Sequence, residues 1–132
     1  MRIVIAEDSV LLRAGIGRLL VDAGHTVVAA VDNATALLRA VEDTAPDLAI
    51  IDVRMPPTFS DEGVRAAVII RAQNPSVAVL VLSQYVEERY AGELIADRSS
   101  GLGYLLKDRV ADVEQIRFDQ IGCIASMNRL TD

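Results

Sequence analysis

Three carboxylates follow strand-length apolar runs and could together hold a metal ion. Glu7 and Asp8 come directly after the run Arg2 to Ala6, and Asp52 comes directly after Leu48 to Ile51. Like charges placed close together disfavour joint ionisation, so a pocket of three carboxylates needs a cation or protons. Oxygen ligands without histidine or cysteine favour Mg²⁺, which keeps bound water and leaves positions for phosphate oxygens. The cluster therefore predicts an Mg²⁺ site.

A hydroxyl and an ammonium group follow two further apolar runs. Ser83 comes after Val77 to Leu82, and Lys107 comes after Gly103 to Leu106. Lys107 would supply a compact positive charge to a phosphoryl group, and Ser83 would donate to one of its oxygens. Carboxylates form aspartyl-phosphate intermediates, and phosphoryl transfer asks a protein mainly for positioning and charge neutralisation. Asp52 is therefore the candidate phosphoacceptor.

Each of these residues also has a purely structural interpretation. Asp52 could cap a turn after a strand. Glu7 and Asp8 could complement the dipole of a following helix, and Lys107 could be a solvated lysine. Ser83 alone carries no information. The set is more specific than its members, because four separate strand ends each carry a suitable residue.

Strands and helices alternate along the chain and would position these side chains. The apolar runs are rich in β-branched residues and nearly continuous, as expected for strands covered on both faces. The predicted strands are Arg2 to Ala6, Thr26 to Val31, Leu48 to Ile51, Val77 to Leu82 and Gly103 to Leu106. This alternation predicts a parallel α/β sheet with right-handed crossovers. Ligand sites of such sheets lie beyond the carboxyl ends of the strands.

Helical patterns lie between the predicted strands. Ser9 and Asn33 are candidate N-caps for the first two helices. The third is expected to bury the stripe Val64, Ala67, Val68 and Arg71. Ile69 and Ile70 fall outside that stripe and are a candidate contact patch. The fourth helix would span roughly Glu87 to Ala96, and the fifth would begin near Ala111.

Composition narrows the classes of function. The chain has 132 residues, the length of one domain, and its 52% hydrophobic but 4% aromatic residues predict an aliphatic core. A formal net charge of -6 opposes direct nucleic-acid binding, which usually needs a basic face. Cys123 is the single cysteine, so no internal disulfide is possible, and the single histidine, His25, is expected on a surface turn. With no signal-peptide pattern and no apolar run of membrane-spanning length, we expect a cytoplasmic protein without membrane contacts.

Several motifs resemble the receiver domain of two-component response regulators. They are IAED (Ile5 to Asp8), LAIIDVRMP (Leu48 to Pro56), VLVLS (Val79 to Ser83) and GYLLK (Gly103 to Lys107). The loop MPPTFSDEG and the segment YLLKDRVAD are similar to actinobacterial NarL/LuxR-type regulators. The resemblance covers residues 1–114. It implies a flavodoxin-like (βα)5 doubly wound parallel sheet with strand order 2-1-3-4-5.

The resemblance also implies a phosphorylation site with its metal. Asp52 would accept a phosphoryl group from a sensor histidine kinase. Mg²⁺ would be bound by Asp8, Asp52 and the backbone carbonyl of Arg54, with Glu7 acting through water. Such a protein is a signalling switch rather than an enzyme, since it catalyses only its own phosphorylation and autodephosphorylation.

A switch pair and an output surface are implied in the same way. After phosphorylation, the Ser83 hydroxyl would move toward a phosphoryl oxygen and the Tyr104 ring would turn inward. The output, including a possible homodimer, would use the fourth helix, fifth strand and fifth helix. Tyr104 could equally be an ordinary core aromatic.

Residues 115–132 depart from the family pattern. This segment, QIRFDQIGCIASMNRLTD, does not match the family's usual final helix. Ile116, Ile121, Ile124 and Met127 could form an apolar stripe, so we expect the segment to form the fifth helix from atypical sequence. We expect no DNA-binding domain within these 132 residues. We therefore expect a receiver excised from a longer transcriptional regulator, whose DNA contacts belong to another domain. A stand-alone receiver is the alternative.

Two other functions remain open. The chain could be a phosphate-independent receiver-like module for protein interaction, if the pocket is inert. It could also be an Mg²⁺-dependent aspartyl-phosphate phosphohydrolase resembling haloacid dehalogenases. Those enzymes carry a second aspartate two residues after the nucleophile, where this chain has Arg54. No glycine-rich phosphate loop follows a strand, so no nucleotide cofactor is expected.

Overall fold

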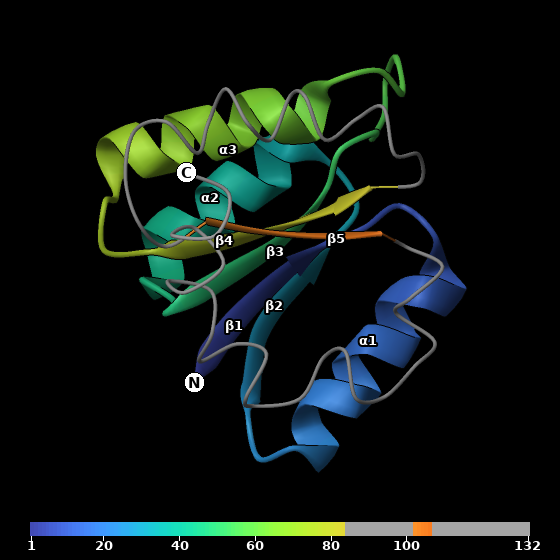
Figure 1. Ribbon diagram of the computed structural model, residues 1–132, viewed down its shortest axis with the longest axis vertical. Coiled ribbons are helices and arrows are strands. Elements are labelled where there is room, and N and C mark those ends of the chain that lie inside the picture. Colours follow the sequence, from blue (N-terminus) through green and yellow to red (C-terminus); the bar gives the residue numbers. More distant parts are fainter. Residues whose placement is uncertain (84–101, 107–132) are drawn as a thin grey trace.

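A five-stranded parallel sheet forms the centre of the computed structural model, with strand order β2-β1-β3-β4-β5 (Figure 1). The structure describes residues 1–83 and 102–106, and for Ser83 and 102–106 it describes the backbone alone. Along the chain the elements are β1 (Arg2–Ala6), α1 (Val10–Asp22), β2 (Thr26–Val31), α2 (Ala34–Thr44), β3 (Leu48–Asp52), α3 (Glu62–Gln73), β4 (Ala78–Ser83) and β5 (Leu102–Leu106). The predicted α/β class and strand order are confirmed.

Helices cover both faces of the sheet, which explains why its strands are apolar throughout. In β1, Ile3 and Ile5 pack in the cluster that includes Ile16 of α1, whereas Val4 and Ala6 pack in the cluster that includes residues of α2 and α3. Figure 1 shows α1 on one side of the sheet and the other two helices on the opposite side. Because successive side chains of a strand point to opposite faces, both sets must be apolar.

The first two helices begin at the predicted N-caps. The Ser9 hydroxyl accepts a hydrogen bond from the Leu12 backbone N–H at 3.3 Å, and the Asn33 side-chain oxygen accepts one from the Ala36 N–H at 2.8 Å. Each bond satisfies a backbone donor that has no partner within the helix. Both helices are therefore fixed at the edge of the sheet where their preceding strands end.

The predicted buried face of α3 is right for Ala67, which is buried, and wrong for Val68. Val68 is 45% exposed and Ile69 is 38% exposed, whereas Ile70 is only 1% exposed. The buried positions of the helix are Glu62, Gly63, Ala66, Ala67 and Ile70. These recur at helical spacing from Gly63, whose backbone packs against β3 and so sets the rotation of the helix. Ile70 belongs to the core and is not part of a surface patch.

Several predicted elements lie outside the described residues. These are the fourth helix, the fifth helix and the segment 115–132. Among the residues that the structure describes, no helix is both long enough and apolar enough to cross a membrane.

Candidate functional site

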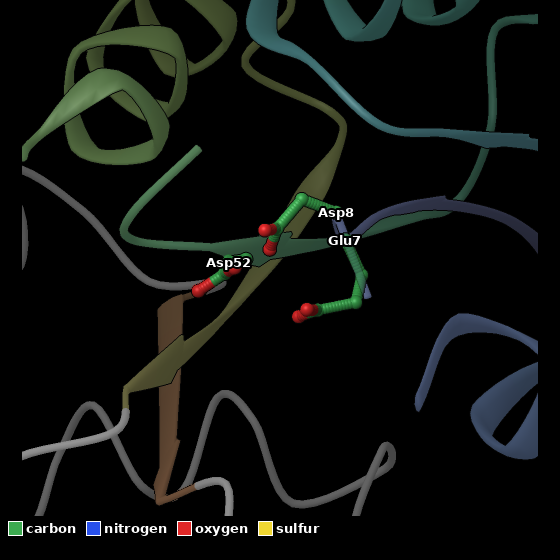
Figure 2. A group of neighbouring side chains, drawn as sticks. All are labelled: Glu7, Asp8 and Asp52. Atoms are coloured by element: carbon green, nitrogen blue, oxygen red, sulfur yellow. The ribbon is translucent and has the colours of Figure 1, made fainter. Parts of the chain in front are cut away.

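The three predicted carboxylates meet at the carboxyl ends of two neighbouring strands. Glu7 and Asp8 directly follow β1, and Asp52 is the last residue of β3, which pairs with β1 in parallel. One carboxylate oxygen from each residue lies within 4.8 Å of those from the other two. Figure 2 shows the three side chains directed around a common space. The structure thus brings together residues that are 44 positions apart in the sequence.

Burial makes this cluster costly without a counter-charge. Glu7 and Asp52 are buried, and Asp8 is half-buried. Charges removed from water cost free energy unless they are paired or coordinate a metal. Three carboxylates at this separation form the oxygen-rich, negatively charged donor set that suits a hard divalent cation. The residues therefore fit Mg²⁺ by their chemistry.

The turn after β1 is fixed by contacts of Glu7. Its side-chain Oε1 accepts from the Ser9 backbone N–H at 3.1 Å, and its backbone N–H donates to the Val31 carbonyl at 3.0 Å. The Arg13 guanidinium donates to the Glu7 carbonyl at 2.8 Å. Arg13 therefore places a positive charge beside the acidic turn and ties α1 to it. No sequence pattern marks Arg13, because a contact spanning six residues follows no helical spacing rule.

The β3–α3 loop, residues 53–61, begins at the candidate phosphoacceptor. The Arg54 backbone N–H donates to Asp52 Oδ1 at 3.3 Å, and the Arg54 side chain is exposed. The far end of the loop is held by Glu62, whose carboxylate accepts from the backbone N–H groups of Thr58 and Ser60 at 2.8 and 2.9 Å and from the Thr58 hydroxyl. These bonds, led by that of the Thr58 hydroxyl, lower the pKa of Glu62 to about 2. Glu62 is therefore an anionic anchor for the loop.

Gly63 brings the start of α3 into contact with β3. Its backbone N–H donates to the Val53 carbonyl at 2.9 Å. A β-carbon at this position would lie 1.8 Å from the Asp52 carbonyl oxygen, a distance that no side chain tolerates. Glu62 and Gly63 were both missed as site residues in the sequence. The only sequence feature that marks them is an acid followed by glycine where the third helix is expected to begin, and the burial of the acid is visible only in the structure.

The other predicted site residues are described in part. Ser83 ends β4, the strand beside β3, and Tyr104 pairs with Val81 at the centre of β5. Their backbones are therefore on neighbouring strands, as the switch-pair prediction requires, while their side chains are outside the description. Lys107 follows β5 and lies outside the described residues.

His25 is buried, contrary to the expected surface position. The chain reverses at Gly24, which has φ of 93°, and the His25 backbone N–H donates to the Leu20 carbonyl at 3.0 Å. The Met1 amine lies 3.1 Å from His25 Nδ1. Burial, with a smaller contribution from the N-terminal charge, lowers the pKa of His25. The residue lies at the opposite ends of the strands from the carboxylates, because it precedes β2.

Known proteins resemble this chain in sequence. The family model of the response regulator receiver domain matches residues 3–116. The transcriptional regulatory protein LnrK of Bacillus subtilis is 31% identical over 113 residues, or 85% of this chain and 49% of LnrK. The oxygen regulatory protein NreC of Staphylococcus haemolyticus is 32% identical over 110 residues, or 82% of this chain and 48% of NreC. The chain thus spans about half the length of these curated relatives.

A solved structure shows the same fold. The signal receiver domain of NarL from Mycobacterium tuberculosis matches with a TM-score of 0.76 and 29% identity, over 93% of this chain and 94% of that one. Sequence and structure agree on the same family. Receiver domains generally bind Mg²⁺ at an acidic pocket, and Glu7, Asp8 and Asp52 lie close together in this chain. The chain belongs to the response regulator receiver domain family of two-component signalling.

Proposed function

We propose that the chain is a phosphorylation-dependent switch whose phosphoacceptor is Asp52. The observation that carries this proposal is the cluster of Glu7, Asp8 and Asp52, with carboxylate oxygens within 4.8 Å of one another at the ends of two strands. Asp52 is the buried member that ends the central strand β3. An Asp52 oxygen would attack the phosphorus of a phosphohistidine on a sensor kinase. The P–N bond breaks as the new P–O bond forms, and the electron pair of the P–N bond stays on the kinase imidazole, which takes up a proton from solvent and leaves as the neutral ring.

Each neighbouring group would have a distinct role in this reaction. Asp8, Asp52 and the Arg54 carbonyl would hold Mg²⁺, with Glu7 acting through water. When bound, Mg²⁺ neutralises charge on the phosphoryl oxygens. Lys107 would contact a phosphoryl oxygen, because its compact ammonium is suited to phosphate.

The output would follow from a change in packing. We propose that the Ser83 hydroxyl bonds the phosphoryl group and that Tyr104 then turns inward. The surface of the fourth helix, β5 and the fifth helix would report this change, including through a homodimer. LnrK is a transcriptional regulatory protein by name, and the chain spans about half of it. In a longer parent protein, the output would therefore be transcriptional control through a DNA-binding domain.

The test is the intact mass of the chain after incubation with acetyl phosphate, with and without Mg²⁺. We expect the native chain to gain one phosphoryl group only with Mg²⁺, and Asp52→Asn to gain none. Asp43→Asn is the matched control, since Asp43 is exposed on α2, and it should gain phosphate normally. A folded native chain that gains nothing would support the phosphate-independent module instead. Phosphate on folded Asp52→Asn would refute the site assignment.

A further inference from the structure

Glu62 closes the β3–α3 loop with a buried charge. Only 7% of the residue is exposed. Its carboxylate accepts from both the backbone and the hydroxyl of Thr58 and from the backbone of Ser60. Burying a carboxylate is costly unless hydrogen bonds replace water, and three donors from the loop do so here. The loop is therefore fastened to the first residue of α3.

The next residue extends this anchor to the phosphoacceptor. Gly63 donates its backbone N–H to the Val53 carbonyl at 2.9 Å and packs directly against the Asp52 carbonyl. Thus the first residues of α3 contact the loop at its beginning through Gly63 and near its end through Glu62. The β3–α3 loop, which contains Arg54, is therefore bonded to the start of α3 near both of its ends.

The bonds that hold the loop determine how well the orientation of the Arg54 backbone carbonyl is fixed. The backbone carbonyl of Arg54, a proposed Mg²⁺ ligand, belongs to this loop. The direction of a loop carbonyl depends on the contacts that hold the loop backbone. Losing such contacts commonly weakens metal binding. We propose that Glu62 is a positioning residue, which holds the β3–α3 loop so that the Arg54 carbonyl faces the metal site. This inference rests on the proposed function.

A direct effect of charge is the alternative explanation for any effect of Glu62. Among the described residues, the group of carboxylates close enough to share a metal ion consists of Glu7, Asp8 and Asp52 and does not include Glu62. Asp61 separates the two explanations, because it is the neighbouring acid and does not anchor the loop backbone. Its exposed carboxylate pairs with Arg65 at 2.9 Å, and its contact with the loop is with the Ser60 side-chain hydroxyl at 3.2 Å. Positioning predicts an effect at Glu62 alone, whereas charge predicts similar effects at both.

The experiment measures phosphorylation of the full chain by acetyl phosphate as Mg²⁺ is titrated. For Glu62→Ala we expect the half-saturating Mg²⁺ concentration to rise about tenfold. The rate at saturating Mg²⁺ should stay within about threefold of the native value, because Glu62 does not contact the reacting atoms. Glu62→Gln keeps one acceptor oxygen and should give a smaller rise. Asp61→Asn should leave the half-saturating concentration within about twofold.

A substitute variant and a calorimetric titration cover the cases in which Glu62→Ala does not fold or the native chain accepts no phosphate. If circular dichroism shows that Glu62→Ala is unfolded, Thr58→Val replaces it. This substitution at an exposed residue removes the hydroxyl that bonds Glu62 and Ser60 but leaves both backbone bonds to Glu62, so about a threefold rise in the half-saturating Mg²⁺ concentration is expected. An unchanged half-saturating concentration in a folded variant, or an equal rise in Asp61→Asn, would overturn the positioning role. If even the native chain accepts no phosphate, the proposed function fails. Calorimetric titration with Mg²⁺ alone then compares the same variants, and equal affinities would overturn the inference.

Discussion

Asp52 is held through its backbone as well as its side chain. Its Oδ1 accepts from the Arg54 N–H at 3.3 Å, while its carbonyl oxygen lies against Gly63 at the start of α3. The backbone of α3 at Gly63 thus lies directly against the end of β3. The position of the candidate phosphoacceptor therefore depends on a residue without a side chain.

Replacing Gly63 by alanine should disturb both the fold and the site. The new β-carbon would lie 1.8 Å from the Asp52 carbonyl oxygen, so α3 or the end of β3 must move. We expect the free energy of unfolding to fall by about 1 to 3 kcal/mol, as for other overpacked cores. Urea denaturation followed by circular dichroism measures this change.

Gly15 provides the matched control for this substitution. It lies inside α1, and a β-carbon there would meet nothing within 4 Å. Since alanine is the better helix former, Gly15→Ala should raise the free energy of unfolding by about 0.5 to 1 kcal/mol. Gly63→Ala with native stability would show that α3 does not press on Asp52.

At the scale of elements, α1 and α2 are each followed by a turn with positive φ, but a different type of residue adopts it in each case. The chain after α1 turns at Gly24, which adopts a left-handed conformation with φ of 93°. The chain after α2 turns at Ala45, which has φ of 46° and ψ of 63°. The left-handed region is unfavourable for any residue with a β-carbon, so Ala45 carries strain that glycine would relieve.

Ala45→Gly should therefore stabilise the protein by about 0.5 to 1 kcal/mol, despite the greater freedom of glycine in the unfolded chain. The corresponding C-cap of α1, Ala23, has φ of -85° and needs no glycine. Ala23→Gly should accordingly lower stability by a few tenths of a kcal/mol to about 1 kcal/mol. Thermal and urea unfolding of both variants would check the contrast. Equal effects of the two substitutions would contradict it.

The strands and the first two helix starts could be predicted because their causes are local. A strand covered on both faces is apolar at every position, and its length is visible in the sequence as an uninterrupted run. Predicted and observed strands accordingly agree within one residue at each end. Ser9 and Asn33 act on backbone donors three residues away, which is equally local. The three carboxylates followed from their positions directly after predicted strands.

Features that depend on tertiary contact could not be predicted in the same way. The predicted stripe of α3 and its observed buried face both contain apolar residues, and the contact of Gly63 with β3 determines which of them is buried. Similarly, His25 follows a glycine turn, where surface residues are common. The turn nevertheless brings its backbone N–H to the Leu20 carbonyl at the end of α1, and the residue is buried. Glu62 is an ordinary acidic residue of a first helical turn until Thr58 and Ser60 enclose it.

For the whole molecule, the strand order concentrates negative charge at one edge of the sheet. Because β1 and β3 are adjacent and parallel, the acids that follow them must meet. Two unit charges 4.8 Å apart repel by roughly 3 kcal/mol at an effective dielectric constant of about 20. The fold thus has a site that is destabilising by itself and stabilising once a cation binds, because the native state alone assembles it.

Asp8→Asn should have opposite effects on the stability of the chain without and with Mg²⁺. Without Mg²⁺, removing one charge of the cluster should raise the free energy of unfolding by about 1 kcal/mol, less than the full repulsion because Asp8 is half-buried. With Mg²⁺ at about ten times its dissociation constant, the native chain should gain about 1.4 kcal/mol and Asp8→Asn much less. Urea unfolding at constant ionic strength measures both.

The control is Asp43→Asn, which changes the net charge from -6 by the same single unit but lies exposed on α2. If the stabilisation came from overall charge, Asp43→Asn would raise the free energy of unfolding as much as Asp8→Asn does. Its gain in stability on adding Mg²⁺ would also equal that of Asp8→Asn. The geometry predicts instead that Asp43→Asn behaves as the native chain under both conditions. A loss of stability in Asp8→Asn without Mg²⁺ would mean that the three carboxylates do not repel one another in the folded protein. In that case a bound cation would no longer be needed to explain the site.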